Sequence, residues 1–154
     1  MPKSKKSAYG YGEELAFSGK SEALPPLETW PNQYQGYEIK IECPEFTSVC
    51  PKTHLPDFGK LTLTYFPNQL CIELKSFKYY LLAYRNMGIF YENAVNRILD
   101  DVVKAARPHW AVLEGSFTTR GGMHSTITAR YPRKNFEFPS KIFQPPRGQQ
   151  NRGF

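Results

Sequence analysis

Residues 90–106 carry an apolar stripe with the period of an α-helix. Its apolar side chains recur every three to four residues: Phe90, Ala94, Val95, Ile98, Leu99, Val102, Val103 and Ala106. A stripe this wide has to be buried against another layer of the protein. Pro108 marks the end of the helix, because proline does not continue one. The clearest element of the chain is therefore a helix that covers an apolar surface supplied by other segments.

Segments on both sides of this helix alternate apolar and polar residues, as half-buried strands do. The strand candidates are residues 37–43, 60–66, 70–74, 110–117 and 124–131. A second, shorter helix is predicted over residues 76–86. The order strands, helices, strands predicts an α+β domain, in which an antiparallel four-stranded sheet carries two helices on one face. Such a sheet leaves strand edges unpaired, so we expect a homo-oligomer that assembles through its sheet edges.

The ordered domain is predicted to span residues 37–131 of a 154-residue chain, a length that suits one domain. Glycine, proline and polar residues in residues 1–36 predict a flexible arm with no core of its own. Residues 132–154 predict a flexible basic tail, with five basic side chains against one acidic, in a chain of net charge +6. Such a tail is typically a solvated end, and nucleic acid is not an expected partner; an RNA-binding arm is the alternative.

Three further features concern location. No run of residues approaches the roughly 18 apolar residues that a membrane span needs. The lysines near the amino terminus have no apolar segment behind them, so a secretory signal is not expected. Three cysteines are an odd number, and we expect reduced thiols in the cytoplasm.

Cys50 is the candidate nucleophile. It lies in a segment between two strand candidates, which is expected to be a loop near the surface, and Asp57 follows seven residues later. A lone cysteine is more often a small buried apolar residue, and this alternative stays open. A dyad with His54 is a further possibility. Cys43 and Cys71 fall on strand periods, and the spacing of cysteines and histidines does not predict a metal site.

Several short motifs occur in one order along the ordered region. They are Cys50-Pro51-x-Thr53 with Asp57 downstream, the ELKSFKYY stretch of residues 73–80, Tyr84-Arg85-Asn86, Phe90-Tyr91-Glu92 and Thr119-Arg120-Gly121-Gly122. Together they resemble the NADPH-dependent 7-cyano-7-deazaguanine reductases, the QueF-type nitrile reductases of queuosine biosynthesis, in their short single-domain form. The ELKSFKYY stretch separates these reductases from the GTP cyclohydrolases that share their fold. The resemblance implies the tunnelling fold, whose subunits assemble through their sheets into rings.

The resemblance also implies a reaction and a set of site residues. Cys50 would attack the nitrile to form a covalent thioimide, Asp57 would deliver a proton, and two hydrides from NADPH would give the aminomethyl product. Glu92 matches the acid that anchors the base. The other residues implied to bind substrate are Ile72, Glu73, Leu74 and Tyr91. The residues implied to bind the NADPH phosphates are Lys75, Lys78 and Arg120.

Tyr91 departs from the family pattern, which usually has histidine before the anchoring glutamate. Tyrosine donates a hydrogen bond but does not exchange a proton near neutral pH. If the histidine only orients the substrate, Tyr91 replaces it; if it carries protons, activity is altered or His54 compensates. Two other functions remain as alternatives. One is a GTP cyclohydrolase-like or pterin-handling enzyme of the same fold, and the other is a non-catalytic RNA-binding module.

Overall fold

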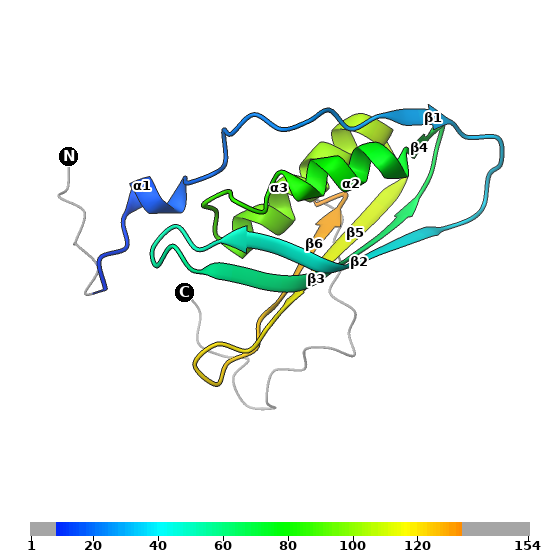
Figure 1. The fold of residues 1–154 in the computed structure, drawn as a ribbon. Coiled ribbons are helices and arrows are strands. Elements are labelled where there is room, and N and C mark those ends of the chain that lie inside the picture. Colours follow the sequence, from blue (N-terminus) through cyan, green and yellow to red (C-terminus); the bar gives the residue numbers. More distant parts are fainter. Residues whose placement is uncertain (1–8, 134–154) are drawn as a thin grey trace, which may run out of the picture.

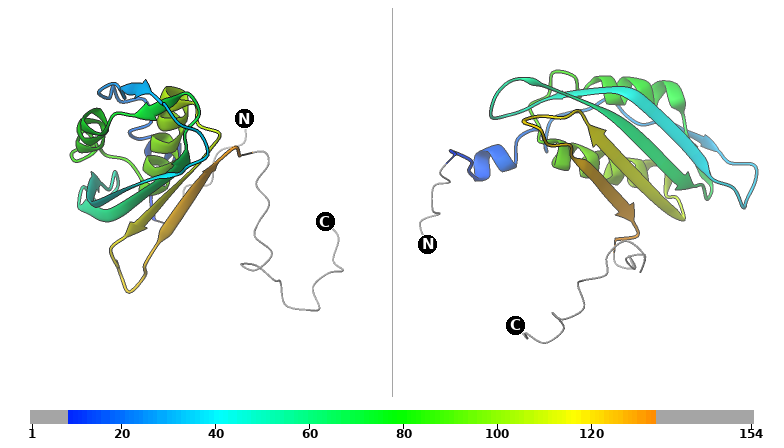
Figure 2. Two further views of the ribbon diagram at one scale, coloured as in Figure 1. Left: turned by 90° about the vertical axis from the view of Figure 1, so that its right-hand side faces the viewer. Right: turned by 90° about the horizontal axis from the view of Figure 1, so that it is seen from below.

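A four-stranded antiparallel sheet forms the body of the protein (Figure 1). The computed structural model describes residues 9–133, so the predicted tail lies outside the described residues except for its first two positions. In spatial order the strands are β2 (Ile39–Val49), β3 (Pro56–Phe66), β5 (Trp110–Phe117) and β6 (Thr126–Tyr131). Figure 2 shows helices α2 (Leu74–Leu82) and α3 (Tyr91–Ala106) on the same face of this sheet. The α+β prediction with four strands and two covering helices is confirmed.

Helix α3 supplies the largest part of the core. Its apolar stripe faces the sheet, with Ala94, Val95, Ile98, Leu99, Val102 and Ala106 all buried. On β5, a Cβ atom added at Gly115 would lie only 2.6 Å from Cγ2 of Val95, so glycine allows the close approach of helix and strand. The helix ends at Ala106, and its C-cap residue Arg107 takes a left-handed conformation just before Pro108.

Strands β2 and β3 are longer than the sequence pattern predicts. A bulge between Cys43 and Phe46 shifts the register of β2, which then continues beside β3 to Val49. The alternation of apolar and polar residues is broken at this bulge, and for that reason the residues beyond it resemble a loop in the sequence. The turn that follows is consequently short, and both strands lead directly into it.

The predicted strand over residues 70–74 forms a second, smaller sheet. Strand β4 (Leu70–Ile72) pairs with β1 (Thr29–Pro31), which the sequence pattern did not predict. The strand ends early because Glu73 already caps helix α2, accepting hydrogen bonds from the backbone N–H groups of Lys75 and Ser76 at 2.8 and 2.7 Å. Helix α2 therefore begins at Leu74, two residues before its predicted start.

Residues 9–36 run beside the helices, with a short helix α1 (Glu13–Ala16) near their beginning (Figure 1). Leu24 and Leu27 pack against the main core, and the backbone N–H of Glu28 donates a hydrogen bond to Ser76 Oγ at 2.9 Å. The domain boundary at residue 36 and the flexibility of the arm remain predictions. Residues 9–133 contain no helix that could span a membrane.

Candidate active site

Cys50 lies at the start of the tight turn between β2 and β3. Its carbonyl oxygen accepts a hydrogen bond from the backbone N–H of His54 at 2.9 Å, and its own N–H donates to the carbonyl of Leu55 at 2.9 Å. The expected surface loop is present, since residues 52–56 are exposed, but Cys50 itself is buried, with only 6% of it exposed. His54 is exposed and does not line the cavity beside Cys50, so the structure gives no support to a dyad.

The turn around Cys50 stabilises its thiolate. Burial acts to raise the pKa of the thiol, but hydrogen bonds from the Thr53 hydroxyl and from the backbone N–H groups of Thr53 and Lys52 outweigh it and lower the pKa. Hydrogen bonds to the charged form of a thiol favour the nucleophilic species. The Cys-Pro-x-Thr spacing thus has a physical role, since it places the threonine hydroxyl within reach of the sulfur.

Asp57 is the second titratable group of the site. It is at the beginning of β3, with its side chain only 4% exposed, and it forms an ion pair with Arg120. Burial raises the pKa of the Asp57 carboxyl, and the Arg120 guanidinium opposes that rise without cancelling it. Ser48 lies directly opposite Asp57 in the β2–β3 register, and its fully buried hydroxyl has no hydrogen-bond partner among the described residues.

Arg120 reaches Asp57 from the hairpin between β5 and β6. Two hydrogen bonds between Arg120 and Met123 close this hairpin at 2.8 and 2.9 Å, and Gly121 and Gly122 both have positive φ. The resemblance assigns Arg120 to the phosphates of NADPH. In this structure the guanidinium contacts the candidate acid instead, so Arg120 belongs to the same cluster as Asp57.

The amino-terminal end of α3 completes a cavity of about 380 Å³. The Tyr91 ring stacks on Phe117 with 4.3 Å between centroids, and its hydroxyl donates to Ser125 Oγ at 3.2 Å. Within residues 9–133 the Glu92 carboxylate has no hydrogen-bond or ion-pair partner, so it is available to a ligand. The full lining of this cavity is Tyr11, Cys50, Thr53, Asp57, Phe90, Tyr91, Glu92, Thr118, Arg120, Met123 and Ser125.

The remaining site residues predicted from the resemblance lie elsewhere, around the start of α2. Ile72 is buried and donates its backbone N–H to the Tyr65 hydroxyl at 3.0 Å, while Glu73 caps the helix and Leu74 is 60% exposed. Lys75 and Lys78 are exposed and form no ion pair in the described part of the chain. None of these five residues lines the Cys50 cavity, so one chain holds the predicted site in two separate groups.

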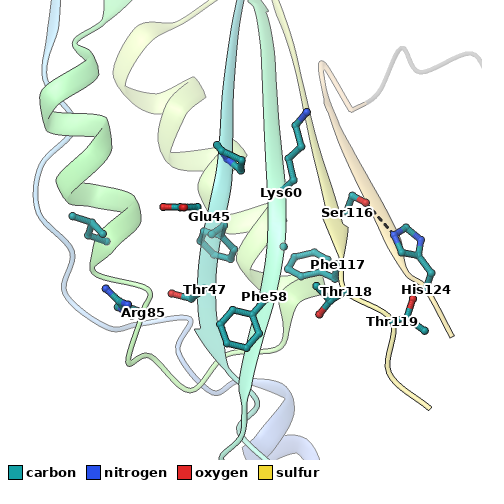
Figure 3. A pocket seen from close by; sticks show the side chains of 14 residues that line it. Glu45, Thr47, Phe58, Lys60, Arg85, Ser116, Phe117, Thr118, Thr119 and His124 are labelled. Carbon is teal, nitrogen blue, oxygen red and sulfur yellow. Dashed lines mark hydrogen bonds between the residues drawn. The ribbon is translucent and has the colours of Figure 1, made fainter. Parts of the chain in front are cut away.

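Two further hollows lie between these groups. Leu74 and Lys78 line a groove of about 320 Å³ between α2 and β2. Residues 44–47 on β2 also line a larger hollow of about 840 Å³, and Thr118 at its far end borders the Cys50 cavity as well. Figure 3 shows this larger hollow extending from Arg85 across Phe58 to His124, which is hydrogen-bonded to Ser116 Oγ at 3.1 Å.

Six residues that line the cavity are not among the predicted site residues: Tyr11, Thr53, Phe90, Thr118, Met123 and Ser125. Thr53 and Phe90 belong to the quoted motifs without an assigned role, and Thr118, Met123 and Ser125 lie next to the Thr119–Gly122 motif or within three residues of it. Tyr11 had no local signal, since it reaches the cavity through a long-range contact. Among residues 9–133 there is no group of three histidine, cysteine or acidic side chains placed to hold a metal ion.

A cysteine thiol of lowered pKa, a buried carboxyl and a carboxylate without a partner in the described residues surround one cavity on an antiparallel α+β scaffold, and these are the groups that an enzyme with a cysteine nucleophile uses. The family described as QueF-like protein matches residues 56–136, and the chain belongs to this family.

Two relatives are named NADPH-dependent 7-cyano-7-deazaguanine reductase. The protein of Elusimicrobium minutum is 58% identical over 127 residues, which cover 82% of this chain and 96% of the relative. The protein of Chloroherpeton thalassium is 59% identical over 107 residues, which cover 68% of this chain and 92% of the relative. A crystal structure of the archaeosine synthase QueF-Like in the apo form aligns with a TM-score of 0.59 at 20% identity, covering 63% of this chain and 95% of that one. This last similarity concerns the fold.

Proposed function

We propose that this protein is an NADPH-dependent 7-cyano-7-deazaguanine reductase that converts the nitrile to the aminomethyl group, in queuosine biosynthesis. The relatives at 58 and 59% identity carry this name. The observation that supports the chemistry most directly is the Cys50 thiol, whose lowered pKa and position beside Asp57 suit attack on an electrophilic carbon. The GTP cyclohydrolase-like and RNA-binding alternatives gain no comparable observation.

Glu92 anchors the substrate in this proposal. Its carboxylate has no partner among residues 9–133 and lines the cavity that contains Cys50. A carboxylate accepts two parallel hydrogen bonds from the N–H and amino group on the pyrimidine edge of a deazaguanine. Tyr91 orients the ligand in this proposal, because its ring is held by Phe117 and its hydroxyl by Ser125.

The covalent step uses Cys50 and Asp57. The Cys50 thiolate donates an electron pair to the nitrile carbon, one carbon–nitrogen π bond breaks, and its electrons move to the nitrogen. The Asp57 carboxyl gives that nitrogen a proton, so a neutral thioimide forms and Asp57 becomes a carboxylate. The pKa of Asp57 is raised even beside Arg120, which favours the protonated acid, and the Ser48 hydroxyl opposite Asp57 is available to the protonated form.

Lys75 and Lys78 fit the phosphates of NADPH, because both are exposed cations one helical turn apart that form no ion pair in the described region. Arg120 joins them once it is released from Asp57. When bound, NADPH supplies the hydrides that reduce the carbon–nitrogen bond. The three positive side chains therefore serve to bind and place the dinucleotide, whereas the covalent step and the proton transfer take place at the residues of the Cys50 cavity.

Subunits assemble into a ring through their sheet edges in this proposal. Strands β2 and β6 are the two edges of the sheet, and α2 lies next to β2. Strand β6 begins just after Ser125, which lines the Cys50 cavity, and just after the hairpin that carries Arg120. This edge of the sheet is therefore next to the cavity. Pairing of β2 with β6 of a neighbour would bring the lysines of one copy towards the cavity of the next. We place this assembly in the cytoplasm.

Addition of 7-cyano-7-deazaguanine to the protein and NADPH should decrease the absorbance of the reduced nicotinamide. Without NADPH, the intact mass of the protein should increase by the mass of the nitrile. Cys50→Ala should abolish both signals, because it removes the attacking sulfur, and Cys43→Ala is the matched control. Turnover by Cys50→Ala would exclude the thioimide route, and no turnover by the unaltered protein would exclude the proposed reaction.

A further inference from the structure

Tyr11 contributes to the cavity that contains Cys50, although it belongs to the amino-terminal segment to which the motifs assign no role. Its ring lies 5.8 Å from that of Phe90, between centroids, at an interplanar angle of 38°. Phe90 and Tyr91 line the same cavity. Three aromatic side chains from two distant parts of the chain therefore surround one site, and Tyr11 is the one that comes from outside the catalytic domain predicted from sequence.

The segment that carries Tyr11 is fixed to the residues that precede and begin α3. Ser18 Oγ donates a hydrogen bond to the carbonyl of Gly88 at 2.6 Å, and Asn93 Nδ2 donates to the carbonyl of Ala16 at 2.7 Å. The Arg97 guanidinium also donates to the carbonyl of Gly19. These contacts join side chains and backbone that are more than 65 residues apart in sequence, so they define where the segment lies.

Gly19 makes the approach of the segment especially close. Its φ is +74°, and a Cβ atom added there would lie 2.6 Å from Cβ of Ile89 and 2.8 Å from the carbonyl oxygen of Gly88. Both the backbone conformation and the lack of space require glycine at this position. The segment is thus packed directly on the residues that lead into the cavity wall.

Lys52 connects Tyr11 to the turn of the nucleophile. Its ammonium group lies 5.7 Å from the centroid of the Tyr11 ring and 3.5 Å from the carbonyl oxygen of Gly10. The backbone N–H of the same residue contributes to the lowered pKa of Cys50. The position of the Tyr11 ring is consequently tied to the turn that presents the sulfur.

We propose that Tyr11 is a positioning residue for the substrate, whose ring packs against the planar base of 7-cyano-7-deazaguanine at the mouth of the cavity. The inference rests on the proposed function, from which it takes its ligand. Tyr11 is 45% exposed, and within residues 9–133 its hydroxyl makes no hydrogen bond, so its ring is the part that is available. Base stacking on an aromatic side chain needs only such a ring.

The test measures equilibrium binding of 7-cyano-7-deazaguanine in the Cys50→Ala background, where the covalent step is absent. Tyr11→Ala should weaken binding by about tenfold, the size expected for loss of one base–aromatic contact. Tyr11→Phe, which retains the ring, should recover most of the lost affinity. Phe17→Ala is the matched control, because Phe17 is in the same segment, is 62% exposed, has Lys20 5.0 Å from its ring centroid and does not line the cavity.

With Cys50 present, Tyr11→Ala should raise KM and leave kcat close to its original value, since a stacking contact is equally present in the ground and transition states. Unchanged affinity of Tyr11→Ala, or an equal loss in Phe17→Ala, would overturn the inference. Failure of Tyr11→Phe to recover affinity would also overturn it. The proposed function itself fails if the Cys50→Ala protein does not bind the nitrile and the unaltered protein does not turn it over. This outcome is distinct from the outcomes that concern Tyr11 alone.

Discussion

The ion pair between Asp57 and Arg120 joins a candidate acid to a candidate phosphate-binding group. Burial raises the pKa of Asp57 and Arg120 opposes that rise, so removal of the guanidinium should raise the pKa further. In Arg120→Gln, Asp57 should then stay protonated to higher pH. The pH above which adduct formation slows should move upward, because the proton donor persists there.

Intact-mass measurement of the rate of adduct formation against pH, without NADPH, checks this shift apart from any effect on the dinucleotide. Lys60→Gln is a suitable control, because it removes one exposed positive charge that pairs with Glu42 instead. An unshifted pH profile in Arg120→Gln would mean either that Asp57 is not the proton donor or that Arg120 does not affect the pKa of Asp57.

Single residues of the site were predictable where short motifs carry them. Cys50, Asp57, Tyr91, Glu92 and Arg120 were predicted and lie around one cavity. Burial of Cys50 and the pairing of Arg120 with Asp57 were not predictable, because both depend on how two strands and a hairpin meet in space. Local sequence contains the chemical groups of a site but not the partners that modify their pKa values.

The packing of α3 on β5 depends on the absence of a side chain at Gly115. Gly115→Ala should destabilise the protein by about 1–3 kcal/mol, the usual cost of overpacking, since its Cβ would meet Val95 and the Phe117 ring. Denaturant unfolding measures the change. Gly12→Ala is the control, because an added Cβ has open space there, and equal stability of the two variants would contradict the packing argument.

Helices and strands of the main sheet were largely predictable from hydrophobic period, and their ends were not. Helix α3 and strands β5 and β6 lie within a few residues of prediction because their patterns are unbroken. The bulge after Cys43 interrupts the pattern of β2, and the cap formed by Glu73 moves the start of α2. Strand β1 was missed because three residues that include a proline carry no alternation of their own.

Separation of the lysines of α2 from the Cys50 cavity leads to a prediction about assembly. If Lys75 and Lys78 of one copy serve the Cys50 cavity of the neighbouring copy, two variants that are each inactive should restore activity when they are coexpressed. Cys50→Ala together with a Lys75→Ala/Lys78→Ala double variant should regain about a quarter of the activity, because random mixing leaves that share of neighbouring pairs intact. Activity that stays at the level of the separate variants would show that each chain works alone.

The attachment of residues 18–31 has a consequence for biosynthesis. Their partners, which include Ile72 on β4, Gly88 and Arg97, leave the ribosome tens of residues later. The nascent amino-terminal segment therefore cannot complete its attachment until Arg97 has left the ribosome. We expect the docking of this segment to follow the synthesis of Arg97 rather than to guide the first steps of folding.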